Sequence, residues 1–152
     1  MTRDGILVTR HDRYLSTTTN VADRPEFADR RRVSGEREDW WVEDFTLEEL
    51  RTLRARQPRA DRDQAYNDQF LIPTFEEVLD LAAEAGVRTE PEVKAPGLFG
   101  SLNLDPLPEL VRILRERGLD GADAMASIQC FEPAFLARLD AVVDTPLLML
   151  VF

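Results

Sequence analysis

Short apolar runs alternate with helical patterns through the second half of the chain, and this alternation constrains the possible fold most strongly. We expect strands over 87–94, 126–131 and 147–152, and helices over 74–86, 107–117 and 133–139. Such alternation is typical of βαβ units, in which the strands lie parallel to one another. The run 147–152 is apolar throughout, as in a strand that is covered on both faces. The sequence therefore predicts an α/β fold with a parallel sheet.

Local signals mark where the helices begin and end. The segments Thr46-x-x-Glu49 and Thr74-x-x-Glu77 have the spacing of a capping box, which opens a helix. Gly86 and Gly118 follow the helical patterns at the position where a glycine commonly ends a helix. The apolar residues expected on the buried helix faces are Leu47, Leu50, Leu53, Val78, Leu79, Leu81, Ala82, Leu110, Ile113 and Leu114.

Two polar stretches, 16–40 and 57–70, lack any sustained apolar period. Connections of this length usually serve a site as a lid or an insertion. Arg30-Arg31-Arg32 could bind an anion, although a run of charge in a loop is more often solvated. Trp40-Trp41 could line a substrate groove, and packing the excursion onto the rest of the domain is the role we expect.

Composition narrows the class of protein. A chain of 152 residues suits one domain, and 43% hydrophobic and 32% charged residues are typical of a soluble globular protein. The net charge of −10 argues against a nucleic-acid-binding surface. The single Cys130 excludes an internal disulfide and a cysteine metal cluster. No apolar run is long enough to span a membrane, and no signal peptide is present, so we expect a cytoplasmic location for the chain as given.

His11 is the only histidine, and it is therefore the one side chain whose ordinary pKa suits proton transfer near neutral pH. It follows a turn signal, Asp4-Gly5, and a short apolar run over 6–8 that we expect to form an opening strand. A lone histidine beside Asp12 is otherwise a surface or capping residue. Asp12 is expected to orient His11 or the turn, and Glu43-Asp44 to belong to the entry of the Thr46 helix.

Alternation along the predicted strand 87–94 places Glu92 and Lys94 on the same side, although Pro91 is unusual in a central strand. The pair could be an ordinary surface ion pair or part of a site. In the next strand, alternation turns Cys130 away from Gln129, which predicts a small buried residue rather than a reactive thiol.

These segments occur in the order found in a known family. The opening TRDGILVTRHDRYLSTTTN resembles the TKDG-x-LVV-x-HD-x-x-L-x-RTT segment of glycerophosphodiester phosphodiesterases. Further stretches that resemble the family are VADRPEFADRR (21–31), WVEDFTLEEL (41–50), IPT (72–74), EVKAP (92–96), IQCFEP (128–133) and PLL (146–148). The resemblance implies a TIM barrel, the (β/α)8 fold. Eight βα units need about 200 to 250 residues, so we expect a single partial barrel domain over 1–152, with a loop-rich insertion at about 16–45.

The resemblance also implies a chemistry. Family members hydrolyse glycerophosphodiesters to glycerol 3-phosphate and an alcohol, in glycerol and lipid metabolism, with a divalent cation, calcium ahead of magnesium. His11 then acts as general acid and base, Glu92 as a metal ligand, and Lys94 as a group that stabilises phosphoryl charge. Gln129 and Phe131 are expected to touch the substrate. Complete family members are often periplasmic or secreted.

Departures from the family pattern are equally informative. The family carries an H-R-G histidine and a Glu-x-Asp metal pair upstream of the opening turn, and no second histidine exists here. We therefore expect a central fragment that is inactive alone. Its open barrel edges at 126–131 and 147–152 would be partly uncovered and would promote oligomerisation. The alternatives are a non-catalytic remnant or binding protein of the same fold, and an unrelated α/β protein.

Overall fold

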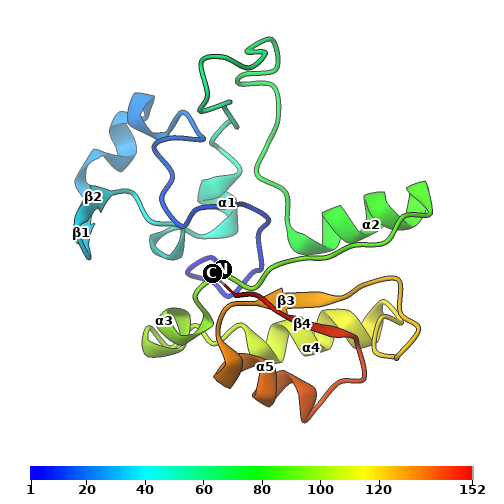
Figure 1. Cartoon of the computed structure of the whole chain (residues 1–152). Coiled ribbons are helices and arrows are strands. Elements are labelled where there is room, and N and C mark those ends of the chain that lie inside the picture. The colour runs from blue at the N-terminus through cyan, green and yellow to red at the C-terminus, as the bar shows by residue number, and fades with distance from the viewer. Residues whose placement is uncertain (152) are drawn as a thin grey trace. The chain divides into compact units, whose positions relative to one another are not determined.

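The computed structural model describes residues 1–151 and divides into two compact units, which are described separately (Figure 1). The first unit is Met1–Thr74, and the second begins at Phe75. Most of the first unit is irregular chain with short helices, whereas the second contains the longer helices and the parallel strands.

The first unit contains three 3-10 helices, one two-stranded hairpin and one short α-helix. They are η1 (Val21–Asp23), η2 (Pro25–Arg30), β1 (Arg32–Ser34), β2 (Arg37–Asp39), η3 (Val42–Asp44) and α1 (Leu47–Leu50). The expected opening strand over 6–8 is wrong. Val8 makes an isolated antiparallel bridge to Thr74, and the three residues of the run are only half-buried. A run of three apolar residues with polar neighbours on both sides offers too little buried surface to form a barrel strand.

The hairpin β1–β2 lies inside a stretch that the sequence pattern left without structure. Its strands pair antiparallel, and Gly35 adopts a φ of +63° at the first position of the two-residue loop. A Ser-Gly pair at 34–35 is the signal that could have revealed this turn, because a two-residue hairpin loop needs a positive φ there.

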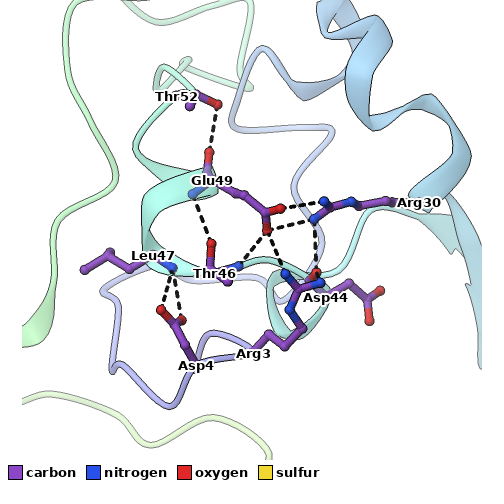
Figure 2. A network of polar contacts seen from close by, with 8 residues as sticks. All are labelled: Arg3, Asp4, Arg30, Asp44, Thr46, Leu47, Glu49 and Thr52. Atoms are coloured by element: carbon purple, nitrogen blue, oxygen red, sulfur yellow. Dashed lines mark hydrogen bonds and ion pairs between the residues drawn. The ribbon is translucent and has the colours of Figure 1, made fainter.

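The Thr46 capping box is confirmed and extends into a larger polar network (Figure 2). The Glu49 N–H donates to Thr46 Oγ1 (3.2 Å), and the Thr46 N–H donates back to Glu49 Oε2 (2.9 Å). Arg30 and Arg3 also donate to the Glu49 carboxylate. Asp4 caps the same helix from a distant part of the chain by accepting from the Leu47 N–H (3.0 Å).

This network corrects the expectation for the arginine run. Arg30 pairs with Glu49, and Arg32 pairs with Asp44 (2.6 Å), so these two partly exposed side chains bind carboxylates of the same unit rather than an external anion. The tryptophans pack as expected. Trp41 is 4% exposed, and its Nε1–H donates to the Arg32 carbonyl (3.0 Å).

The second unit is an α/β arrangement. Its elements are α2 (Phe75–Ala85), α3 (Pro96–Ser101), α4 (Leu107–Glu116), β3 (Ile128–Cys130), α5 (Pro133–Asp140) and β4 (Leu147–Met149). Figure 1 shows β3 and β4 side by side, and they pair in parallel with Gln129 opposite Leu148. The helix α5 connects the two strands and packs against both.

Residues 89–93 extend this parallel ladder on the other side of β3, although they form isolated bridges rather than the strand we expected over 87–94. The bridges pair Thr89 with Ala126 and Glu92 with Gln129. Thr89 and Val93 donate their N–H groups to β3 or its flank, and Pro91 accepts from Gln129. Pro91 has no N–H to donate between these bonds, so the ladder is interrupted at that residue.

The helices of this unit match the periodic patterns closely. The buried faces are Phe75, Leu79 and Ala82 of α2, Leu110, Ile113 and Leu114 of α4, and Phe135, Leu136 and Leu139 of α5. Leu81 is the exception at 67% exposure, since it lies two positions beyond Leu79 and so on another face of the helix. Gly86 and Gly118 follow the helices with φ of +63° and +66°, as expected. The short helix α3 was not expected, because its Pro-Gly beginning lacks a helical apolar period.

The expectations for the last two strands are partly wrong. Ala126, Ile128 and Cys130 are at most 1% exposed, so this strand is not uncovered. In β4, Leu148 is 41% and Met149 48% exposed, so this strand is not covered on both faces. The cause is that β4 pairs with β3 alone within residues 1–151. The strand was expected to continue to residue 152, which lies outside the described residues.

Candidate functional site

Glu92 and Lys94 lie at the carboxyl end of the parallel ladder of the second unit. Register places Glu92 opposite Gln129, and residues in register on parallel strands point to the same face of the sheet. Ile128 and Cys130, on the opposite face, are buried. The local pairing therefore turns Glu92 away from the buried face of β3 and toward the face that Gln129 occupies.

These two charged side chains form an ion pair. Lys94 Nζ lies 3.0 Å from Glu92 Oε2, and the side chains are 34% and 19% exposed. The pair is thus accessible to a ligand on one side while each charge is partly compensated by the other. A carboxylate oxygen and an ammonium group held together in this way can bind a cation and an anionic phosphoryl oxygen respectively.

Gln129 and Phe131, the other residues expected near the substrate, frame the same end of the ladder. Gln129 is half-buried, and its Nε2 donates to the Glu90 carbonyl (3.0 Å), which links β3 to the neighbouring segment. Phe131 is half-buried and directly follows β3. Cys130 lies on the opposite, buried face, where its Sγ donates to the Val93 carbonyl (3.2 Å). Burial raises the pKa of the Cys130 thiol, in agreement with the inert residue we expected.

His11 belongs to the first unit, where its side chain is 81% exposed. Its Nδ1 lies 2.8 Å from Asp12 Oδ1. Burial favours the neutral carboxyl of Asp12, but hydrogen bonds from His11 and Tyr14 outweigh it and lower its pKa. An ionised Asp12 accepts the Nδ1 proton, which leaves Nε2 as the ring nitrogen without a proton. Asp12 thus orients His11, as expected from the sequence.

The Arg10 side chain stabilises the loop that carries His11 by hydrogen bonds to several of its residues. Its guanidinium donates to the Asp12 and Tyr14 carbonyls (2.5 and 2.7 Å) and to Thr18 Oγ1 (2.8 Å). Burial lowers its pKa to about 10, with Asp12 opposing the shift, so the group stays cationic at neutral pH. The role of Arg10 could not be predicted from the sequence, because no local spacing distinguishes it from the other seventeen arginines.

Glu43 is a second residue whose position the sequence did not reveal. Its side chain is 2% exposed and accepts hydrogen bonds from Arg13 and from Arg32 (3.2 Å). Arg13 also stacks over the Trp41 ring at 4.6 Å. Arg13 follows the His11-Asp12 pair directly, so its contacts with Glu43 and Trp41 also restrain the loop that carries His11. A buried carboxylate needs such cationic partners.

Comparison with protein families decides what these segments belong to. The model of the "Glycerophosphoryl diester phosphodiesterase family" matches residues 1–152, the whole chain. The chain belongs to this family.

Individual relatives agree with this assignment. The chain is 46% identical over 100 residues to glycerophosphodiester phosphodiesterase GDPD6 of Arabidopsis thaliana, covering 62% of this chain and 27% of that protein. It is 31% identical over 156 residues to the glycerophosphodiester phosphodiesterase of Haemophilus influenzae, covering 91% of this chain and 42% of that protein. The chain therefore spans less than half the length of these relatives.

A solved structure supports the fold. A protein from Silicibacter pomeroyi, described as a glycerophosphoryl diester phosphodiesterase, matches 99% of this chain with a TM-score of 0.75 and 22% identity, over 52% of its own length. The glycerophosphodiester phosphodiesterase fold is of the TIM-barrel type, as expected. Residues 1–151 contain part of such a barrel and no closed one.

Within residues 1–151 no group of three or more His, Cys, Asp or Glu side chains is arranged to hold a metal ion. No helix among these residues is both long and apolar enough to cross a membrane.

Proposed function

We propose that the protein carrying this chain hydrolyses glycerophosphodiesters to glycerol 3-phosphate and a free alcohol. The observation that carries the proposal is the family match over all 152 residues. It is supported by the accessible Glu92–Lys94 pair at the carboxyl end of a parallel ladder, the end where barrel enzymes place their catalytic groups. The His11-Asp12 pair supplies a histidine whose Nδ1 contacts a carboxylate and whose side chain is 81% exposed.

His11 is the proton-transfer group in this proposal. The 2-hydroxyl of the substrate glycerol attacks phosphorus and passes its proton to a base outside the described residues, while His11 gives a proton to the oxygen of the leaving alcohol as the bond between that oxygen and phosphorus breaks. Water then opens the resulting cyclic phosphate: His11 takes a proton from the water, which restores the acid, and the base returns its proton to the leaving 2-oxygen. Asp12 stabilises the protonated imidazole through Nδ1 in the first half of the cycle.

Glu92 and Lys94 are the charge-handling groups. We assign Lys94 to a phosphoryl oxygen and Glu92 to a divalent cation, which neutralises phosphate charge when bound. Glycerophosphodiester phosphodiesterases generally depend on a metal ion, and we place calcium ahead of magnesium. One carboxylate supplies only part of the roughly six to eight oxygens that calcium takes, so the described residues do not form a complete site. We assign Gln129 and Phe131 to contacts with the substrate.

The test is hydrolysis of glycerophosphocholine with calcium, with magnesium and with chelator. Two proteins are compared: residues 1–152, and the same residues joined to the flanking segments of a full-length relative. We expect release of glycerol 3-phosphate by the joined protein, reduced about 10²- to 10⁴-fold by His11→Ala and strongly by Glu92→Gln. Glu84→Gln, an exposed position on α2, is the matched control and should leave the rate unchanged. Residues 1–152 alone should release none.

The same assay distinguishes the proposed hydrolase from a non-catalytic binding protein of the same fold. If the protein only binds, the joined protein should bind glycerophosphocholine in calorimetry and show no turnover under any metal condition. Metal-dependent turnover that persists in both His11→Ala and Glu92→Gln would contradict the assigned roles while leaving the family activity intact.

A further inference from the structure

Glu132 occupies the N-cap position of α5, yet its side chain makes no capping bond to that helix. Its carboxylate reaches the first turn of α3 instead, where Oε2 accepts the backbone N–H of Gly97 at 2.9 Å. Gly97 lies three residues after Lys94, and Glu132 lies two residues after β3. The contact therefore joins the first turn of α3, shortly after the Glu92–Lys94 pair, to the residue that precedes α5, shortly after β3.

Only glycine at position 97 permits this approach. A Cβ built there would lie 2.7 Å from Glu132 Oε2, closer than side-chain atoms come in folded proteins. The colliding atom is the end of a flexible side chain, so an alanine would displace the carboxylate rather than the backbone. The hydrogen bond thus depends on the residue type at both of its ends.

The turn that the bond restrains is strained. Ala95, directly after Lys94 and before Pro96, has φ +45° and ψ +48°, the left-handed conformation that non-glycine residues disfavour. A residue before proline is normally extended. Such a conformation persists only where the surroundings impose it. The Phe99 N–H bond to the Ala95 carbonyl (3.2 Å) and the Glu132–Gly97 bond both restrain the first turn of α3, which directly follows Ala95.

Two further hydrogen bonds connect Glu132 to the segment that carries Glu92. Cys130 Sγ donates to the Val93 carbonyl (3.2 Å), and the Glu132 N–H donates to Cys130 Sγ (3.3 Å). The backbone of Glu132 is thereby anchored to the segment that carries Glu92. The Glu132 side chain then connects this anchored backbone to Gly97, which follows Lys94 in the chain.

We propose that Glu132 is a positioning residue which, through the Gly97 N–H and the strained turn at Ala95, holds Lys94 against Glu92. The inference rests on the proposed function for its catalytic meaning, because Lys94 and Glu92 are the pair assigned to phosphate and cation. The positioning itself concerns only the contacts of the second unit and can be measured without any activity.

Lys94 is the only lysine in the chain, which makes it a direct reporter. Residues 1–152 are treated with an amine-reactive acetylating reagent, and the labelling rate of Lys94 is followed by peptide mass mapping, separately from the N-terminal amine. Loss of one hydrogen bond should let Lys94 leave Glu92, so Glu132→Ala should raise the rate by about three-fold or more. Glu132→Gln keeps an acceptor oxygen and should stay within about 1.5-fold of the unchanged protein.

Gly97→Ala and the double variant complete a cycle that does not rely on Glu132→Ala alone. Gly97→Ala should raise the Lys94 rate as Glu132→Ala does, and the double variant should add nothing further. Circular dichroism confirms that each variant is folded. Equal Lys94 rates in folded Glu132→Ala, Gly97→Ala and unchanged protein would overturn the proposal.

Measurements of turnover test the proposed function independently of the Lys94 labelling. In the joined protein, Glu132→Ala should lower kcat about tenfold with little change in KM, and Glu132→Gln should restore it. Absence of turnover in the unchanged joined protein would defeat the proposed function, while the Lys94 labelling rates would still decide the positioning role.

Discussion

The His11-Asp12 pair is the residue-scale feature on which the proposed acid and base steps depend. We expect Asp12→Asn to weaken the preference for the Nδ1–H tautomer, because a neutral amide no longer demands that proton. The rate of the joined protein should fall about 10- to 100-fold. Long-range proton–nitrogen spectra of the single imidazole report the tautomer directly, since no second histidine contributes signals. Asp140→Asn, an exposed carboxyl in α5, is the control. An unchanged tautomer ratio would show that Asp12 does not orient His11.

Ala95 provides a second test at the residue scale, because the sign of the change in the free energy of unfolding shows whether its turn is strained. Ala95→Gly should raise the free energy of unfolding by about 0.5 to 1 kcal/mol, because glycine adopts φ +45° without steric cost. Ala83→Gly, at an exposed position inside α2, should lower it by a similar amount of roughly 0.5 to 1 kcal/mol. Urea unfolding of both variants checks the pair. A decrease in both would mean that the turn at Ala95 is not strained.

The capped helix α1 has a pH dependence that belongs to the element scale. The Arg30 hydrogen bond, together with the Thr46 N–H, lowers the pKa of Glu49 to about 2. An ordinary Glu has a pKa near 4.3, so the unfolded chain binds this proton first as the pH falls. The contribution of ionised Glu49 is therefore complete above about pH 5 and is lost between there and pH 2.

Glu49→Gln keeps the capping box and removes the charge. We expect its free energy of unfolding at pH 7 to be lower by about 1 to 2 kcal/mol, allowing for the partial exposure of the ion pair. The difference should shrink as the pH is lowered toward 2. Glu48→Gln, an exposed neighbour in the same helix, should show no such trend. A constant difference across this pH range would mean that the Arg30 pair does not stabilise the fold.

At the element scale, the sequence predicted the parts that carry their own local signal. The helices α2, α4 and α5 follow from period and from glycine at their ends, and the capping box at Thr46 was correct. The strand around Pro91 was overestimated, since a missing donor interrupts a ladder that the apolar pattern suggests. The hairpin β1–β2 was missed because its strands carry mainly charged residues, stabilised by pairs that lie elsewhere in the chain.

In the candidate site, too, the sequence predicted the residues that carry a local signal and did not predict the contacts between distant residues. Motifs indicated His11, Glu92 and Lys94, and alternation correctly placed Gln129 and Cys130 on opposite faces of β3. Other contacts around these groups came only from the structure: those of Arg10 and Glu43 around the His11 loop, and that of Glu132 with the Gly97 N–H. Their partners are backbone atoms or distant residues, and no short spacing in a sequence encodes such contacts.

At the scale of the whole molecule, the exposed edge of β4 should govern the behaviour of residues 1–152 in solution. Leu148, Met149 and Val151 are 41%, 48% and 82% exposed, and an apolar edge strand is a template for pairing with another chain. We expect concentration-dependent oligomers at about 10 μM and above, measured by sedimentation velocity. Met149→Lys with Val151→Lys should restore a monomer, because charge on an edge opposes pairing. Val33→Lys, at a 67% exposed position of β1, should leave the oligomers unchanged and so separate edge pairing from general surface hydrophobicity. A monodisperse monomer of the unchanged chain across this concentration range would show that the β4 edge does not drive association.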